Sequence, residues 1–453
     1  MPARPRLRRE AATARPVPSI VLVGRSLQRG VLRPVEVGLD ESGEIVAIGR
    51  DLRGGRRHDL GEAVLLPSAV DLHVHFRSPD VPHEGENWAR GTVQAALGGV
   101  GVAGEMPNAQ PPTSSASRLE ERRDRGRGRL AIDLLLYAAL ERPSEVPKLG
   151  RVAGGFKLYL APTTGIEPPG DSDQVAELLR LASLTGLPVA VHAEDPGQFV
   201  DPERATNPVE WDRARPLEAE EGCVERLIAS VPAGLRLHVA HVTSAETARR
   251  LKEAGHSFEC TPHHLLLSDR SGDDARWKVN PPLRSEAVRA GLWEAFRDGH
   301  VPCLASDHAP HEREAKDRPF PRAPAGVPGV GTMLPLLLAR ARAGELSLDR
   351  LQRAACEHPA RWLGLPAGRL ALGHRGGIVA VDFRRRQPFH AARFRDSCGW
   401  SPFEGHEMIF PFEHWHRGER IVEGGEYVGR PTGQVVRPEY AHGASARVLR
   451  GPE

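Results

Sequence analysis

The sequence predicts a (β/α)8 barrel joined to a small β-sandwich that both ends of the chain build together. Eight short apolar runs alternate with helical stretches over about 270 residues, the size typical of such a barrel. Strand patterns separated by turns occur only before and after this region, and 453 residues are too many for one small core. An open, doubly wound sheet is the alternative. No G-x-G-x-x-G follows the first of these strands, which weakens a dinucleotide-binding interpretation.

The N-terminal residues supply the first half of the predicted sandwich. Residues 1–18 carry several arginines without the apolar stretch of a secretory signal, so we expect a disordered basic tail. Ser19–Val23, Val35–Leu39 and Ile45–Ile48 have strand patterns, which assigns residues 19–64 to the sandwich.

Residues 65–365 are expected to form the barrel. Its strands are predicted at Leu65–Phe76, Gly99–Met106, Ile132–Leu140, Gly154–Leu160, Leu187–Ala193, Leu235–Val242, Ser257–Thr261 and Val301–Ser306. Helices are predicted between them, for example at Trp88–Leu97, Asp173–Thr185, Leu217–Ser230, Ala245–Ala254 and Glu286–Asp298.

The C-terminal region is expected to complete the sandwich. A helix is predicted around Arg350–Leu363, followed by strands at Gly376–Phe383 and Arg420–Tyr427 within residues 366–436. Residues 437–453 are polar and irregular, and we expect a tail.

The composition excludes several classes of protein. The 61 basic and 59 acidic residues give a net charge of +2, which provides no reason to expect nucleic acid or an anionic membrane as a partner. No run approaches the roughly 18 apolar residues that span a bilayer. The five cysteines are far apart, without C-x-x-C, which favours reduced thiols in a cytoplasmic protein.

Lysine is unusually rare in this chain. Only five of the 61 basic residues are lysines, which leaves 56 arginines. The lysines are Lys148, Lys157, Lys252, Lys278 and Lys316. Where lysine is kept, its particular chemistry is a candidate reason.

The first predicted barrel strand carries the densest cluster of chemically reactive residues. His73 and His75, in the segment DLHVHFR at Asp71–Arg77, lie two residues apart on a strand and therefore point to the same side. At the C-terminal end of a barrel strand, that side is the mouth where active sites lie. Imidazole is a common metal ligand there, whereas a pair of surface histidines is the alternative.

Three more residues of ligand type stand where later strands end. His192 ends an apolar run, His241 ends the next, and Asp307 follows the last. Satisfied core polar groups rarely gather in this way, so the five residues together favour a metal site. His238 lies within its strand and is expected to support or pack.

Two adjacent histidines and one lysine complete the candidates. His263 and His264 are expected to be structural. Lys157 lies among apolar residues, where a lone ammonium is costly and its pKa should fall. A neutral amine can add CO2 to become a carbamate, whereas a lysine that extends to solvent or pairs with an acid is the alternative.

This arrangement resembles the amidohydrolase superfamily and, within it, the dihydroorotases, from about Ser19 to Val436. The order and spacing of several motifs carry the resemblance. They are DLHVHFR at 71–77, MPN at 106–108, GFKLY at 155–159, HAED at 192–195, KVNPPLR at 278–284 and SDHAPH at 306–311.

The resemblance implies a centre with two divalent metal ions, expected to be Zn2+. Its implied ligands are His73, His75 and Asp307 for one ion, His192 and His241 for the other, and a carboxylated Lys157 as bridge. A bridging hydroxide would attack the ring amide of dihydroorotate to give N-carbamoyl-L-aspartate. Asp307 would carry the proton to the leaving nitrogen. The reverse cyclisation serves pyrimidine biosynthesis.

Substrate choice is expected to depend on the carboxylate of dihydroorotate. Arg77 shares the face of His75, and a guanidinium can bind a carboxylate through two hydrogen bonds. Without the surrounding motif, Arg77 would be one more solvated arginine. The resemblance adds Asn108 and His311 to this task, and Asn280 as a contact of the ring.

Two details qualify the resemblance. Thr163 and Thr164 correspond to a lid over the substrate, although a simple βα turn is the alternative. Ser78–Asp80 replaces the Glu-Pro-Gly common in the family. Lys157 places the chain nearer the members that carry lysine than those with aspartate at this position.

Two kinds of alternative function stay open. An allantoinase or hydantoinase would share the metal ligands but not the need to bind a carboxylate. A catalytically silent subunit that scaffolds aspartate transcarbamoylase should have lost ligands, and here every position is filled. The expected partners are the small-molecule substrate and either a homo-oligomer or aspartate transcarbamoylase.

Overall fold

The computed structural model describes four stretches of the chain, residues 17–77, 87–163, 166–394 and 398–439. Most of the two predicted tails lies outside these stretches, as do Ser78–Asp80 and Thr164. Within the described part of the chain, no helix is long and apolar enough to cross a membrane.

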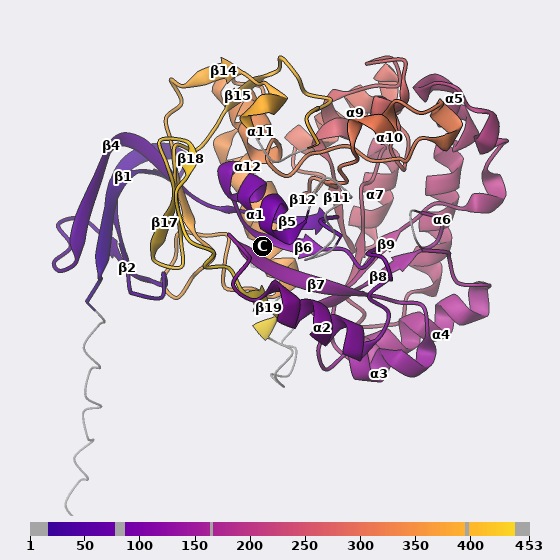
Figure 1. Ribbon diagram of the computed structural model, residues 1–453, viewed down its shortest axis with the longest axis horizontal. Helices are drawn as coiled ribbons and strands as arrows, with labels where there is room; N and C mark the ends of the chain where they lie inside the picture. Colours follow the sequence, from indigo (N-terminus) through magenta and orange to yellow (C-terminus); the bar gives the residue numbers. More distant parts are fainter. Residues whose placement is uncertain (1–16, 78–86, 164–165, 395–397, 440–453) are drawn as a thin grey trace, which may run out of the picture.

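The centre of the molecule is a barrel of eight parallel strands, as predicted (Figure 1). Each strand pairs with the next in chain order, from the first to the eighth. The strands are β5 (Ala69–Val74), β6 (Val100–Glu105), β7 (Asp133–Ala139), β8 (Gly155–Tyr159), β9 (Val189–His192), β10 (Leu237–Val239), β11 (Ser257–Cys260) and β12 (Cys303–Leu304). Most of their residues are buried, as expected for parallel strands covered on both faces.

The first and last strands meet through side chain and backbone. The Asp71 carboxylate accepts a hydrogen bond from the Ser306 amide at 2.9 Å. Beyond the short β12, His308 forms a bridge to Val74, and its carbonyl accepts the His75 amide at 2.8 Å. These contacts bring the segments that carry the two histidines and Asp307 together at the mouth of the barrel.

Helices surround the barrel. Several begin and end within two residues of the prediction: α1 (Trp88–Leu97), α4 (Ser172–Ser183), α6 (Leu217–Ser230), α7 (Ala245–Glu253) and α9 (Glu286–Arg297). Two longer helices were not predicted, α2 (Ala116–Gly126) and α11 (Met333–Arg342). One is almost entirely polar and the other buried along most of its length, so neither shows a clear apolar stripe.

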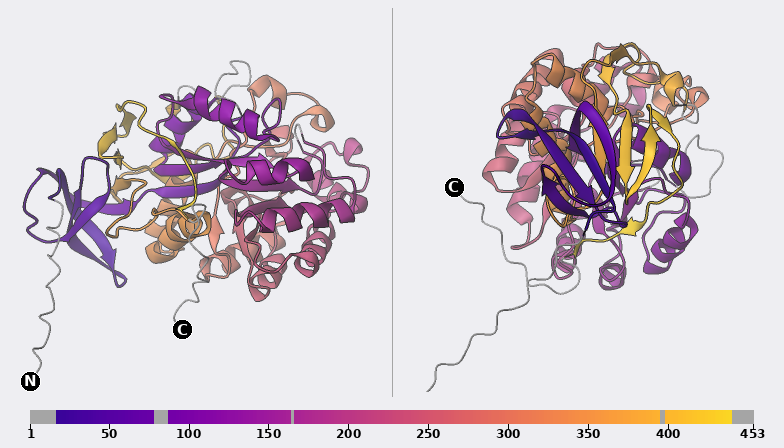
Figure 2. Two further views of the ribbon diagram at one scale, coloured as in Figure 1. Left: turned by 90° about the horizontal axis from the view of Figure 1, so that it is seen from below. Right: turned by 90° about the vertical axis from the view of Figure 1, so that its left-hand side faces the viewer.

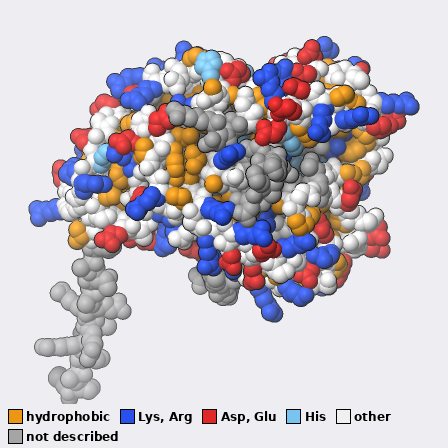
Figure 3. Space-filling model, in the orientation of Figure 1, with side chains coloured by type: hydrophobic (Ala, Val, Ile, Leu, Met, Phe, Trp, Pro, Cys, Tyr) orange, Lys and Arg blue, Asp and Glu red, His pale blue; other side chains and the backbone are white. Residues whose placement is uncertain are grey.

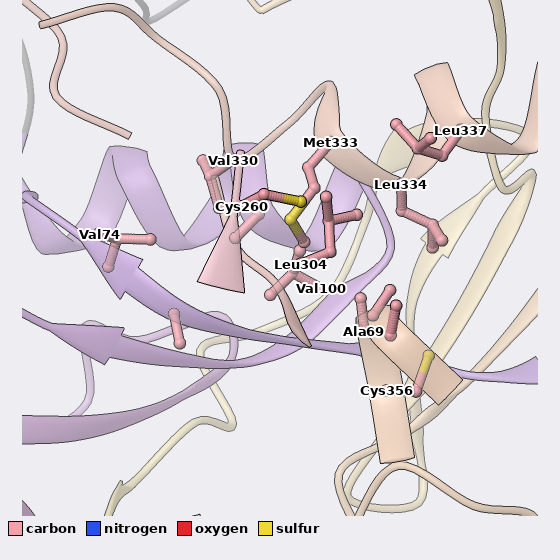
Figure 4. Close-up of a cluster of buried hydrophobic side chains, with 14 of the residues drawn as sticks. Ala69, Val74, Val100, Cys260, Leu304, Val330, Met333, Leu334, Leu337 and Cys356 are labelled. Atoms are coloured by element: carbon pink, nitrogen blue, oxygen red, sulfur yellow. The ribbon is translucent and has the colours of Figure 1, made fainter. Parts of the chain in front are cut away.

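The main core lies between the barrel and its helices. Figure 4 shows Met333, Leu334 and Leu337 of α11 beside apolar side chains from the barrel strands, including Val100 and Leu304. This packing fixes the strands whose C-terminal ends bear the site.

A second sheet unites the two ends of the chain, as predicted. Its strands in spatial order are β18 (Glu426–Tyr427), β17 (Glu419–Glu423), β16 (Glu413–His416), β13 (Ile378–Val381), β4 (Arg56–Pro67), β1 (Ile20–Gln28), β2 (Val31–Leu39) and β3 (Ile45–Gly49). Figure 2 shows the early and late strands side by side next to the barrel. Leu22, Val37, Leu65 and Trp415 belong to its own apolar core.

Three local predictions need correction. The segment predicted as one strand at Leu65–Phe76 is divided between β4 of the second sheet and β5 of the barrel. The division falls at Pro67–Ser68, a proline and a polar residue that could have indicated it, although both halves are buried. The helix predicted at Arg350–Leu363 contains a π-helical turn, Arg353–Glu357. β19 (Val435–Val436), assigned to the sandwich, pairs instead with β7 of the barrel.

Candidate active site

A cavity opens at the C-terminal ends of the barrel strands. It brings together nearly all of the residues selected from the sequence. Its lining is His73, His75, Arg77, Asn108, Tyr159, Thr163, His192, His241, Asn280, Asp307, Ala309, His311, Ala325 and Gly326. Lys157 is fully buried on β8, with Nζ 5.2 Å from the centre of the Tyr159 ring. Thr164 lies outside the described residues.

One group of ligand-type atoms comes from the first and last strands. Oδ1 of Asp307 lies 3.3 Å from Nε2 of His73 and 3.1 Å from Nε2 of His75. One ligand atom from each of the three residues lies within 4.8 Å of the other two, so the group could hold a metal ion.

A second group comes from β9 and the segment after β10. Nδ1 of His192 lies 3.0 Å from Nε2 of His241, and both side chains are buried. The ring centres of His241 and His73 are 5.3 Å apart, which connects the two groups. The donor atoms of four strand ends therefore converge on one small region.

Buried partners orient the histidines from behind. Nδ1 of His73 donates to Glu259 at 2.7 Å, and the other oxygen of Glu259 lies 3.0 Å from Nε2 of His238. Nδ1 of His75 donates to Oδ1 of Asn108 at 2.6 Å. Such contacts fix the tautomer and leave Nε2 of His73 and of His75 as the acceptor. The position of His238 agrees with the supporting role expected for it.

His192 is held in a similar way by a buried ion pair. Its Nε2 lies 2.6 Å from Glu194, which also accepts the Nε of Arg215 at 3.1 Å. Burial raises the pKa of Glu194, but Arg215 and His192 outweigh it and the net pKa is lowered. Glu194 follows His192 by two residues, so its position on the same side was available from the sequence. Glu259 has no such local signal.

Burial decides the protonation of the centre. It is the main cause that lowers the pKa of His73, His192 and His241, with smaller contributions from neighbouring positive groups. Neutral imidazole is the form that binds metal ions. Burial also lowers the pKa of Lys157 to about 8, against the opposing attraction of Glu259.

The donor set fits a metal centre. The buried polar atoms of the described residues that lack a hydrogen-bond partner include two from this site, Nζ of Lys157 and Nδ1 of His241. Leaving a buried polar group unpaired costs about 1–3 kcal/mol, so such atoms mark a place where another group is expected. Four imidazoles, a carboxylate and a lysine that can lose its proton provide suitable ligands.

Three non-glycine residues of the site adopt left-handed backbone conformations. The φ angles are 64° for Arg77, 39° for His241 and 45° for Asp307. This region costs most residues on the order of 1–3 kcal/mol and is found preferentially at functional sites. All three residues stand where a strand has just ended, and the unusual angle turns each side chain toward the mouth.

A buried ion pair, Arg122 with Glu105, holds the backbone of Arg77. Its carbonyl accepts a hydrogen bond from Arg122 of α2, which also pairs with Glu105 at 2.9 Å. Glu105 in turn accepts the Phe76 amide at 2.8 Å and Nε1 of Trp88 at 3.2 Å. Neither Glu105 nor Arg122 was selected from the sequence, because a charged residue in a strand or on a polar helix carries no sign of its partner.

We call the cavity-lining residues Arg77, Asn108, Asn280 and His311 the rim, and neighbouring groups hold their polar atoms in place. Nη1 of Arg77 donates to the carbonyl of Pro310 at 2.6 Å, and its Nη2 lies 3.2 Å from His311. With Oδ1 of Asn108 occupied by His75, the amide nitrogen is the group that Asn108 can offer. Oδ1 of Asn280 accepts a hydrogen bond from Nε1 of Trp211 at 3.2 Å, so the amide nitrogen of Asn280 is likewise the group that it can offer.

The remaining candidates lie near the rim or support it. Thr163 lines the cavity and pairs through its backbone with Ile166. His264 connects the Thr261 hydroxyl to the carbonyl of Pro281, in agreement with a structural role. The ring of His263 packs against His264, 4.4 Å between centres.

Comparisons with known proteins agree with this geometry. A model of the amidohydrolase family matches residues 64–405. The chain is 35% identical over 381 residues to a dihydroorotase of Halobacterium salinarum, across 82% of this chain and 89% of the relative. It is 32% identical over 421 residues to a dihydroorotase of Methanosarcina acetivorans, across 86% and 89%. An L-hydantoinase structure from Arthrobacter aurescens gives a TM-score of 0.86 at 25% identity, across 92% of this chain and 99% of that chain.

Fold and site together define a hydrolase that acts on cyclic amides. The chain belongs to the amidohydrolase family, and its likeness to dihydroorotases over most of its length confirms the resemblance inferred from the motifs.

Proposed function

We propose that this protein is a dihydroorotase, which interconverts dihydroorotate and N-carbamoyl-L-aspartate. The observation that supports this choice is the position of Arg77, with Asn108 and His311 beside the same cavity as the histidines and Asp307. A guanidinium and the amide nitrogen of Asn108 suit a carboxylate on the ring. Cyclisation would be the direction used in pyrimidine biosynthesis.

The centre would hold two divalent metal ions, which we propose are Zn2+. His73, His75 and Asp307 would hold one ion, His192 and His241 the other, and Lys157 as a carbamate would bridge them. Its buried Nζ has no hydrogen-bond partner among the described residues. The ions would supply polarisation of the amide carbonyl and an activated water at neutral pH.

The protein's own residues would then position the ring and move the proton. Arg77, Asn108 and His311 would hold the carboxylate, and Asn280 would contact the ring. Asp307 would accept the proton of the attacking water at Oδ1 or Oδ2 and deliver it to the leaving ring nitrogen. One carboxylate can act as base and then acid because it faces both the histidines and the cavity.

A second candidate function is hydrolysis of an uncharged ring, as in hydantoinases. The structural likeness to L-hydantoinase favours it, since the two folds agree over 92% of this chain. Such substrates lack a carboxylate for Arg77, which is why we place this function second. The predicted lid role of Thr163 and Thr164, and an association as homo-oligomer or with aspartate transcarbamoylase, also stay proposals.

The test is an assay of purified protein with dihydroorotate, hydantoin, dihydrouracil and allantoin, together with metal analysis. We expect turnover of dihydroorotate and two metal ions per chain. Turnover of hydantoin or allantoin without any of dihydroorotate would overturn the assignment.

A further inference from the structure

Two lysines that the site does not use are almost completely buried beside it. Lys278 is 5% and Lys316 is 2% exposed. Together with Lys157 they account for three of the five lysines in the chain. The other two, Lys148 and Lys252, lie at the surface.

Lys278 binds backbone oxygens from one short segment. Its Nζ donates to the carbonyls of Phe320 at 2.8 Å, Pro321 at 3.3 Å and Ala323 at 3.0 Å. The ammonium also lies 4.5 Å from the centre of the Trp211 ring, a contact that stabilises a cation.

Lys316 binds the rest of the same segment. Its Nζ donates to the carbonyls of Pro324 at 2.9 Å and Gly326 at 3.0 Å, and to that of Lys278 at 3.3 Å. The Gly326 amide donates to the Lys278 carbonyl at 2.9 Å. We call residues 320–326 the carbonyl loop, because five of its carbonyls point at two ammonium groups.

Lysine suits this task better than arginine. An ammonium directs three donors from a single atom, whereas the donors of a guanidinium lie in one plane. Neither Lys278 nor Lys316 forms an ion pair with a carboxylate within the described ranges, so backbone carbonyls and aromatic rings are the groups that face the two Nζ atoms. Burial lowers the pKa of Lys278 to about 8 and that of Lys316 to about 7, and an ammonium and a neutral amine can both donate to carbonyls. A chain with 56 arginines retains lysine at both positions.

The carbonyl loop forms one wall of the cavity. Its Ala325 carbonyl accepts Nε2 of His311 at 3.0 Å, and His311 lies 3.2 Å from Nη2 of Arg77. Gly326 lines the cavity with φ of 132°, and a Cβ there would approach the Ala309 carbonyl to 2.6 Å. The position of His311 therefore depends on the path of this loop.

We propose that Lys278 and Lys316 are positioning residues for substrate binding. Their hydrogen bonds hold the carbonyl loop in the path that places the Ala325 carbonyl against His311. They thereby set the affinity for the substrate carboxylate without touching the substrate. The inference rests on the proposed function, because it assumes that His311 binds a carboxylate.

The first experiment compares Lys316→Met and Lys316→Arg with the wild type, using dihydroorotate. We expect both variants to raise KM about tenfold and to change kcat less than about threefold, the pattern of lost ground-state binding. Metal content should stay at the wild-type value. Lys252→Met is the matched control at the surface, and its KM should not change. A variant with wild-type KM would overturn the inference.

A double variant shows whether Lys316 acts through His311. In His311→Asn the contact to Ala325 is altered, so adding Lys316→Met should raise KM no further. If the two effects multiply instead, the lysine acts independently of His311 and the positioning role is wrong.

Hydrogen exchange covers the case in which Lys316→Met does not fold. In Lys316→Arg and Lys278→Arg we expect faster amide exchange at residues 320–326 than in the wild type, with the barrel strands unchanged. Unchanged exchange in the carbonyl loop would refute the inference. A wild type that does not turn over dihydroorotate would instead overturn the proposed function, and the carboxylate role with it.

Discussion

We call the proposed metal ligands at the base of the cavity the floor: His73, His75, Lys157, His192, His241 and Asp307. The floor and the rim are held in place by different kinds of contact. At the floor, His73 and His192 each form a hydrogen bond to a buried carboxylate, Glu259 and Glu194 respectively. In each case the bond uses the ring nitrogen that faces away from the centre. At the rim, Arg77 and His311 instead donate hydrogen bonds to backbone carbonyls. The floor therefore has fixed charge and tautomers, and the rim has a fixed shape.

This difference assigns separate tasks to the two regions. In our proposal the floor would carry the chemistry that every hydrolase of cyclic amides needs, so its loss should abolish turnover of any substrate. The rim would recognise what is attached to the ring, so its loss should act on the carboxylate-bearing substrate alone. On the face drawn in Figure 3, basic and acidic side chains are interspersed.

The largest effect is expected from removing a ligand at the floor. His192→Asn should lower kcat by at least about 10^3-fold for every substrate, because metal-assisted hydrolysis loses its activated water. Metal analysis should show fewer ions per chain. A variant with wild-type kcat would break the division between floor and rim.

Lys157 offers a nearly equal effect with a chemical rescue. Lys157→Ala should lose about 10^3-fold in kcat and recover part of it when a short carboxylate such as acetate replaces the carbamate. Lys157→Arg is the matched control, because it fills the space with a permanent charge and should not be rescued. Rescue of both variants, or of neither, would contradict the proposed carbamate.

At the rim, Arg77→Met should reduce kcat/KM for dihydroorotate by about 10^2-fold, since a charged hydrogen-bonded pair contributes about 2–3 kcal/mol. The metal content should not change, because in the described part of the chain the guanidinium lies against Pro310 and His311, and neither is a ligand of the floor. Loss of metal in this variant would show that the two regions are not separable.

The smallest effect on turnover is expected from breaking the Arg122–Glu105 ion pair that supports Arg77. Arg122→Leu leaves Glu105 buried without its ion pair, which should destabilise the fold by about 3–5 kcal/mol. KM should rise less than in the Arg77 variant, because the guanidinium of Arg77 is still present. Arg125, on the exposed side of the same helix, pairs with Glu121, and Arg125→Leu should cost below about 1 kcal/mol. Thermal unfolding of both variants measures the difference.

Sequence reasoning was most successful where chemistry and position coincide. His73, His192 and Asp307 each stand where an apolar strand ends, so the barrel pattern alone predicts that they meet. The eight strands themselves follow from alternating apolar runs. The division within Leu65–Phe76 was missed, although Pro67–Ser68 stands at it, because the apolar pattern continues on both sides.

Supporting contacts were much harder to predict. Glu259 lies 186 residues from the His73 that it orients, and in the sequence it is an ordinary acid within a predicted strand. Lys278 and Lys316 were noticed as rare lysines, but their partners are backbone carbonyls, which leave no trace in side-chain identity. Such roles depend on the path of a loop and need coordinates.

The most direct test of the floor and rim is the ratio of kcat/KM for dihydroorotate to kcat/KM for dihydrouracil, measured in the wild type and in Arg77→Met with the same metal content. Dihydroorotate carries a ring carboxylate that dihydrouracil lacks. Our account predicts a large ratio in the wild type that falls by about 10^2-fold in the variant, through the loss on dihydroorotate alone. Equal losses on both substrates would contradict it.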